Sequence, residues 1–201
     1  GTAQFGLNYG INNKTGKIEP SEIKRIIEYV ENLGITNIDT AIAYGEAEKI
    51  LGKIGIRKFK ITSKLPYVEG KKIKDIEKMV KSSIKNLKIK KLNCLLIHSS
   101  KNIEKNTFLI LNKMKKLKLK GLVSEIGISI TKFHDIYKIV NNYNLDVIQL
   151  PYNIIDRRFE SQKIINLLKK KKIKIQIRSI FLQGLLFKKY PEIPNFLKVH
   201  S

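Results

Sequence analysis

The chain has 201 residues, of which 42% are hydrophobic and 28% are charged. This balance is typical of a folded globular protein and excludes an intrinsically disordered chain. The longest apolar runs are far shorter than the ~20 residues of a membrane-spanning helix, and the first residues show no signal-peptide pattern, so we predict no membrane association. The single cysteine, Cys94, excludes an internal disulfide and is typical of a reducing cytoplasm, where we expect the protein.

The 40 Lys and Arg residues outnumber the 17 Asp and Glu residues and give a net charge of +23, which invites a nucleic-acid-binding hypothesis. Most lysines, however, lie in helical windows such as "KKIKDIEKMVKSSIKNLKIKK", on faces opposite the Ile, Met and Leu positions. Neither interleaved aromatic residues nor a concentrated basic segment accompanies them. We therefore interpret the charge as a compositional bias on solvated faces and predict no nucleic-acid partner.

Short apolar segments alternate with longer helical windows along the whole chain. We predict strands at residues 2–5, 35–39, 59–64, 93–98, 123–129, 146–150 and 173–179. We predict helices at residues 20–33, 46–53, 72–87, 105–118, 132–142 and 160–170. Pro20 and Thr131 mark two helix starts, and Gly34 and Gly121 mark two helix ends.

Near-continuous apolar strands separated by helices predict a parallel sheet covered by helices. A doubly wound nucleotide-binding sheet would carry a Gly-rich turn after its first strand, but "GLNYGINN" is not such a turn and no G-x-x-x-x-G-K-[ST] motif occurs. No linker or change in composition divides the chain. We therefore predict one α/β domain over residues 1–201, a TIM-type (β/α)8 barrel with about seven βα units that lacks its last strand and helices.

Six consecutive predicted strands each end on a polar or ionisable residue. In a barrel of this type the chemistry lies where the carboxyl ends of the strands meet. A single such residue means little, but six in a row could face one common mouth. These residues are Asp39, Lys64, His98, Ser129, Gln149 and the pair Arg178-Ser179.

The first three of these residues, together with Tyr44, suggest a reaction. A buried carboxylate is costly unless it is paired, and Lys64 is a suitable partner for Asp39. Because an ammonium beside a phenol stabilises the phenolate, we expect Lys64 to lower the pKa of Tyr44 below its usual value of about 10. Tyr44 could then donate a proton to a carbonyl oxygen while His98 orients the carbonyl, with a separate cofactor supplying hydride. The three histidines are far apart in the sequence, so we predict no metal site.

Several stretches spread over the chain carry a more specific signal. They are "GTAQFG" at 1–6, "DTAIAYGEAEKILG" at 39–52, "TSK" at 62–64, "LNCLLIH" at 92–98, "SEIGIS" at 124–129, "IQLPYNIIDR" at 148–157 and "IRSIFLQGLL" at 177–186. In content, order and spacing the chain resembles the aldo-keto reductase family, in its bacterial type, and looks truncated after the seventh strand.

The resemblance implies a catalytic tetrad of Asp39, Tyr44, Lys64 and His98, and reduction of a small aldehyde or ketone substrate. It implies NADPH, or less often NADH, bound across the strand ends. The implied cofactor contacts are Gly1, Thr2, Ala3, Asp39, Ser129, Gln149, Arg178, Ser179, Gly184 and Leu186. Two positions depart from the family pattern. Ile130 stands where Asn often follows the serine, and Arg178 stands where many members stack an aromatic ring on the nicotinamide.

Two alternatives stay open at this point. The missing end of the barrel favours a non-catalytic, nucleotide-binding regulatory protein on the same fold, or an inactive fragment. The +23 charge favours a nucleic-acid binder, and nothing else does. Within the enzyme hypothesis, "GTAQFGLNYGINN" resembles bacterial members associated with surface-carbohydrate metabolism, which favours a sugar-derived carbonyl as the substrate.

Overall fold

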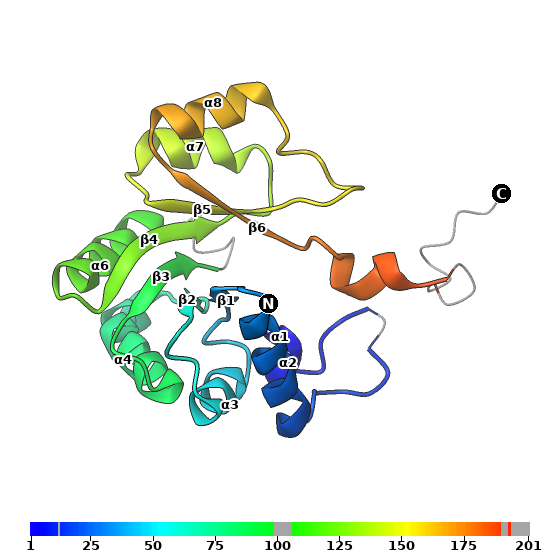
Figure 1. Cartoon of the computed structure of the whole chain (residues 1–201). Helices are drawn as coiled ribbons and strands as arrows, with labels where there is room; N and C mark the ends of the chain where they lie inside the picture. Colours follow the sequence, from blue (N-terminus) through cyan, green and yellow to red (C-terminus); the bar gives the residue numbers. More distant parts are fainter. Residues whose placement is uncertain (12, 99–105, 190–192, 194–201) are drawn as a thin grey trace.

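Six parallel strands form a curled half-barrel (Figure 1). The structure, a computed structural model, describes residues 1–11, 13–98, 106–189 and 193. The strands neighbour one another in chain order and are β1 (Asn37–Asp39), β2 (Lys60–Leu65), β3 (Leu92–Ile97), β4 (Val123–Ser129), β5 (Val147–Pro151) and β6 (Lys174–Arg178). The predicted incomplete (β/α)8 barrel is therefore confirmed.

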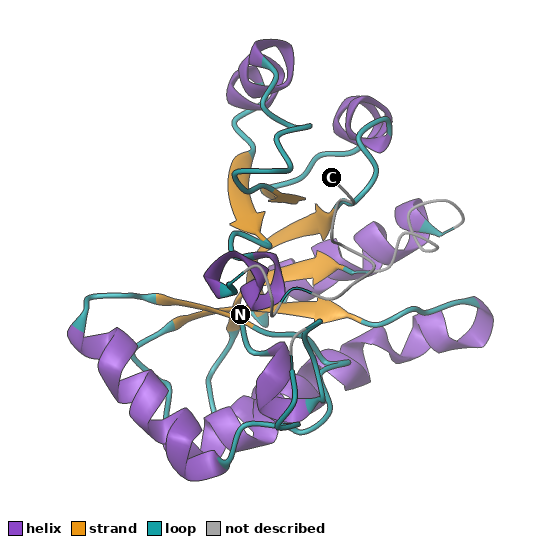
Figure 2. Cartoon of the chain, turned by 90° about the vertical axis from the view of Figure 1, so that its right-hand side faces the viewer, coloured by secondary structure: helices purple, strands orange, loops and turns teal. Residues whose placement is uncertain are grey.

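From α2 onward, helices alternate with the strands in sequence and lie around the outside of the curled sheet (Figure 2). The α-helices beyond the first turn of the chain are α2 (Pro20–Asn32), α3 (Ala47–Ile54), α4 (Ile76–Leu87), α6 (Thr107–Leu119), α7 (Asp135–Asn142) and α8 (Gln162–Lys170). Two 3₁₀ segments, η1 (Gly70–Asp75) and η2 (Leu182–Phe187), complete the described elements. All six helix predictions are thus confirmed, although α7 begins three residues later than expected, the window 72–87 opens as η1, and residue 105 of the window 105–118 lies outside the described residues.

The core has two parts because successive strand residues point to opposite faces of the sheet. Leu95 and Ile97 of β3 belong to a large cluster that includes the buried faces of the helices. Cys94 and Leu96 alternate with them and form a small cluster with Val147 of β5. Cys94 is 1% exposed, as predicted for a small buried side chain, and burial raises the pKa of its thiol to about 12.

The predicted first strand, 2–5, is wrong: residues Ala3–Gly6 form the short helix α1. The backbone N–H of Thr2 donates to the carbonyl of Asp39 at 3.0 Å, but the next residues turn away and Leu7 N–H closes a helical turn on Ala3 O at 3.0 Å. A four-residue apolar segment does not distinguish a strand from a helical turn, so the sequence pattern could not decide between them.

Close packing of α3 against α4 depends on Gly52. A Cβ atom at this position would lie 1.9 Å from the carbonyl oxygen of Asn86, a backbone atom at the end of α4. Only a residue without a side chain allows the two helices to approach in this way, and their approach holds α3 against the sheet beside the loop that carries Tyr44.

We predict that Gly52→Ala destabilises the protein by about 1–3 kcal/mol, because the added methyl group forces the two helix backbones apart. Helix propensity alone predicts the opposite sign, a gain of roughly 1 kcal/mol. Chemical denaturation decides between them. Lys53→Ala, at the neighbouring exposed position of α3, is the matched control and should change stability by less than about 0.5 kcal/mol. A stabilised Gly52→Ala protein would contradict the packing argument.

Candidate active site

The strands bring the predicted polar residues to one end of the sheet. Because parallel strands run in the same direction, residues near their carboxyl ends share one edge. The residues in question are Asp39 at the end of β1, Lys64 near the end of β2, His98 directly after β3, Ser129 at the end of β4, Gln149 within β5 and Arg178 at the end of β6.

Lys64 is the most deeply buried charged group of this cluster. Its side chain is 1% exposed, and its Nζ donates to Asp39 Oδ2 at 2.6 Å and to the carbonyl oxygen of Thr40 at 2.9 Å. Burial lowers the pKa of Lys64, and the Asp39 carboxylate opposes that shift. The predicted Lys64–Asp39 pair is therefore present, with a backbone carbonyl as a second acceptor.

Tyr44 lies in the loop between β1 and α3, next to Lys64 and His98. Its ring meets the His98 imidazole edge-on, with centroids 5.8 Å apart and an interplanar angle of 82°. The Lys64 Nζ lies 5.3 Å from the centroid of the same ring. The backbone of this loop packs closely against the backbone at Gly6. A Cβ on Gly6 would lie 1.9 Å from Tyr44 O, and a Cβ on Gly45 would lie 2.4 Å from Gly6 O.

The expectation that Lys64 lowers the pKa of Tyr44 is wrong. Burial raises the pKa of Tyr44 to about 12, and Asp39 and Tyr9 raise it further, while Arg178 is the cation that lowers it. Asp39, which is paired with Lys64 at 2.6 Å, contributes a negative charge that raises the pKa of the phenol. Tyr44 therefore holds its proton at neutral pH, as a general acid must before it donates.

His98 is neutral in this environment. Burial lowers the pKa of His98 to about 4, and the positive charges of Lys64 and Arg178 lower it as well, while Asp39 acts in the opposite direction. A neutral imidazole can donate one hydrogen bond to a substrate oxygen without competing with Tyr44 as a proton source.

A chain of hydrogen bonds crosses the strand ends from Asp39 to Arg178. Gln149 Nε2 donates to Asp39 Oδ1 at 2.9 Å, and Ser129 Oγ donates to Gln149 Oε1 at 2.9 Å. Arg178 Nε then donates to Ser129 Oγ at 3.2 Å. Both carboxylate oxygens of Asp39 are thus engaged, one by Lys64 and the other by Gln149.

The residues present fit a nicotinamide carboxamide in their chemistry. A primary amide offers one acceptor and two donors, and Ser129 and Gln149 together offer a hydroxyl donor and an amide with both functions. The two are Cα partners in the β4–β5 register and bond one another in this structure. The hydrogen bond between Ser129 and Gln149 could be replaced by hydrogen bonds from these two side chains to a ligand amide.

The remaining predicted cofactor residues lie at varying distance from this cluster. Thr2 Oγ1 donates to Asp39 O at 3.2 Å, which places Gly1, Thr2 and Ala3 beside β1. Ser179 follows Arg178 and accepts from its Nη1 at 3.3 Å. Gly184 and Leu186 lie on η2, which has no buried residue, and the described contacts tie η2 to Ile11 through Gln183 at 3.0 Å rather than to the tetrad.

One buried acid near the site was not predicted from the sequence. Glu48 of α3 is 5% exposed, and its Oε1 accepts from Ser63 Oγ and from Ser83 Oγ, both at 2.7 Å. Burial raises the pKa of Glu48, and the two serine hydrogen bonds act against that shift. The available signal was an acid on the apolar face of α3, between Ala47 and Leu51. Ser63 immediately precedes Lys64, so this junction supports the strand that carries it.

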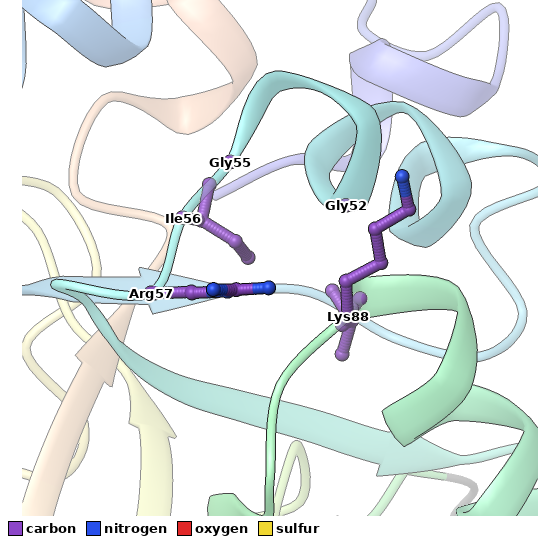
Figure 3. Close-up of a pocket in the computed structure, with 6 residues that line it drawn as sticks. Gly52, Gly55, Ile56, Arg57 and Lys88 are labelled. Atoms are coloured by element: carbon purple, nitrogen blue, oxygen red, sulfur yellow. The ribbon is translucent and has the colours of Figure 1, made fainter.

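A separate hollow of about 370 Å³ lies at the other end of the strands (Figure 3). It is lined by Gly52, Gly55, Ile56, Arg57, Leu87 and Lys88. Gly55 and Lys88 follow the last residues of α3 and α4, so the basic side chains lie beside the negative ends of two helix dipoles. This hollow shares no residue with the strand-end cluster.

Within the residues that the structure describes, no group of three or more His, Cys, Asp or Glu side chains could hold a metal ion. In the same part of the chain, no helix combines the length and apolar character needed to cross a membrane.

Comparison with known proteins matches the chain to one family. The model of the Aldo/keto reductase family matches residues 1–200. No curated protein sequence matches. Among solved structures, aldo-keto reductase AKR11C1 from Bacillus halodurans, in its holo form, has a TM-score of 0.74 at 23% identity, with 88% of this chain and 62% of that chain covered.

Two further structures are similar to the same extent. A protein from Pseudomonas aeruginosa assigned to the aldo-keto reductases has a TM-score of 0.73 at 24% identity, with 89% of this chain and 71% of that chain covered. The glycerol dehydrogenase AKR11B4 from Gluconobacter oxydans has a TM-score of 0.71 at 22% identity, covering 96% and 63%. At these identities the similarity establishes the fold, and the chain spans roughly two thirds of the length of these structures.

We predict that Asp39→Ala destabilises the protein by about 2–4 kcal/mol, because it leaves the buried Lys64 ammonium without a counter-charge. The double variant Asp39→Ala/Lys64→Met should recover at least half of that loss, since no buried charge then needs a partner. Urea denaturation at pH 7 measures both. Glu22→Ala, which breaks the exposed Arg25–Glu22 pair, is the control and should cost less than about 1 kcal/mol. A double variant less stable than Asp39→Ala would contradict this account.

We also predict that His98 makes stability depend on pH. Its pKa falls from 6.5 to about 4 on folding, so the unfolded chain binds the proton more tightly. The stability that His98 contributes is complete above pH 6.5 and is lost progressively as the pH falls from 6.5 to about 4. His98→Gln should lose less stability than the parent protein between pH 7 and pH 5. Equal losses would argue against a neutral, buried His98.

Proposed function

Because the chain belongs to the aldo-keto reductase family, we propose that it is an oxidoreductase that reduces the carbonyl group of an aldehyde or ketone, with NADPH, or less often NADH, as the hydride donor. The observation that carries the proposal is the meeting of Tyr44, His98 and the Lys64–Asp39 pair at the carboxyl ends of three adjacent strands.

Tyr44 is the proton donor in this proposal. Its raised pKa, about 12, keeps the phenol protonated at neutral pH, and its ring lies edge-on to His98 with the centroids 5.8 Å apart. Neutral His98 donates a hydrogen bond to the substrate oxygen and so sets the direction of the carbonyl. Proton transfer from the Tyr44 hydroxyl then completes the alcohol.

Lys64 and Asp39 act on Tyr44 after the proton leaves. The phenolate would be a buried anion, which is costly unless a cation is near. The Lys64 ammonium, 5.3 Å from the ring centroid, supplies that charge. Asp39 keeps the ammonium in place, and Gln149 in turn holds the second oxygen of Asp39. These residues are therefore already positioned before the reaction to stabilise the Tyr44 phenolate that forms during it.

The bound dinucleotide would supply the hydride that this chain lacks. Ser129 and Gln149 would hold its carboxamide, and Gly1, Thr2, Ala3 and Asp39 would lie along the nicotinamide end. Arg178, Ser179, Gly184 and Leu186 complete the proposed contacts. A sugar-derived carbonyl is the substrate class we favour, and the glycerol dehydrogenase among the similar structures is named for a small hydroxylated compound of related chemistry.

We predict that Tyr44→Phe lowers the rate of aldehyde reduction by a factor of about 10²–10⁴, because the variant has no proton to donate. The rise in melting temperature with saturating NADPH should be unchanged, since that rise reports binding to the native state alone. Tyr29→Phe, at an exposed position on α2, is the control and should keep full activity. Undiminished turnover by Tyr44→Phe would exclude Tyr44 as the acid.

A further inference from the structure

Arg178 is a cation without a contacting acid in the described part of the chain. Its guanidinium donates to neutral oxygens: Nε to Ser129 Oγ at 3.2 Å, Nη1 to Ser179 Oγ at 3.3 Å, and Nη2 to Ile130 O at 3.1 Å and to Thr131 Oγ1 at 2.9 Å. These bonds fix the orientation of the group and leave its charge uncompensated.

The surrounding charges do not cancel that of Arg178. Asp39 is the acid of the cluster, and it is already paired with Lys64 at 2.6 Å. Asp156 also acts on Arg178 but forms a two-bond pair with Arg158, at 2.7 Å and 2.8 Å. Counted over these groups, the mouth of the site holds one net positive charge.

The field of Arg178 reaches the residues that would flank a substrate carbonyl. It lowers the pKa of Tyr44 and also that of His98. A charge that influences both proton-handling side chains also influences a ligand held between them.

Arg178 also retains hydrogen-bonding capacity. A guanidinium has five N–H donors, and the four bonds above use four of them. Nη1 therefore keeps one N–H with no partner among the described residues, and its bond to Ser179 is the longest of the set. Half-buried and partly desolvated, such a donor binds an anionic oxygen more strongly than a neutral one.

We propose that the substrate is a carbonyl compound that also carries a carboxylate or phosphate group, and that Arg178 selects it through charge. The proposal rests on the proposed function and narrows it: among small carbonyl compounds, the anionic ones are preferred. It agrees with a sugar-derived substrate only if that sugar is acidic or phosphorylated.

The test compares matched aldehydes that differ in charge. We expect kcat/KM to be about tenfold higher for 4-carboxybenzaldehyde than for its neutral methyl ester, and the ratio to fall close to one in Arg178→Gln. Arg178→Lys should retain most of the preference, and added salt should reduce it. Glyceraldehyde 3-phosphate against glyceraldehyde gives the same comparison for phosphate, so the two pairs show which anion is preferred.

Two results would overturn the proposal. One is a charged-to-neutral ratio that Arg178→Gln leaves unchanged, which would assign Arg178 to cofactor binding alone. The other is an equal fall of the ratio in Arg25→Gln, an exposed site on α2, which would mean that only the overall charge of the protein matters. Because the measured quantity is a ratio, a general loss of activity in any variant does not affect it.

A binding measurement tests the role of Arg178 independently of the proposed reductase activity. Calorimetric titration of 4-carboxybenzaldehyde into Tyr44→Phe and into Tyr44→Phe/Arg178→Gln requires no turnover. We expect the second Kd to be about tenfold higher. Equal Kd values, or no measurable binding to either, would overturn the role of Arg178. Turnover of neither aldehyde by the parent protein would instead reject the reductase function.

Discussion

The burial of a lysine ammonium is the constraint on which the site depends. Lys64 is 1% exposed, and an unpaired charge at such a position would cost several kcal/mol. The buried ammonium is stabilised by hydrogen bonds to one carboxylate oxygen of Asp39 and to the backbone carbonyl of Thr40. Once Asp39 is committed to Lys64, its other oxygen faces Gln149, and from there hydrogen bonds extend to Ser129 and Arg178.

This order of dependence explains why the site spans the whole sheet. The pair joins β1 to β2, Gln149 brings in β5, and Ser129 and Arg178 add β4 and β6. Polar groups pointing into the curl of a parallel sheet would be costly alone, but as a connected set they satisfy one another. The strand ends are therefore polar because each group has a partner on another strand.

Most of the strands and most of the candidate site residues could be predicted from the sequence, because hydrophobic periodicity identifies the strands and the strand ends identify the site positions. Apolar segments of strand length between amphipathic windows identified β1 to β6, and reading the last residue of each strand located Asp39, Lys64 and His98. Two predictions failed for physical reasons that the pattern does not contain. Residues 2–5 are too short to identify a strand, and the pKa of Tyr44 depends on its burial and on the nearby charge of Asp39. Glu48 was missed because its serine partners come from β2 and α4.

The backbone contacts that position the Tyr44 loop affect which other positions of the sequence can be substituted. Gly6 and Gly45 meet through main-chain atoms, and Gly52 meets Asn86 in the same manner. Contacts between main-chain atoms do not depend on which side chains occupy the surrounding exposed positions. The outer faces of the helices can therefore drift toward lysine, isoleucine and asparagine under a mutational bias while Tyr44 keeps its place. A lysine-rich surface and an ordered reaction centre therefore coexist in this chain because different parts of the polypeptide determine them.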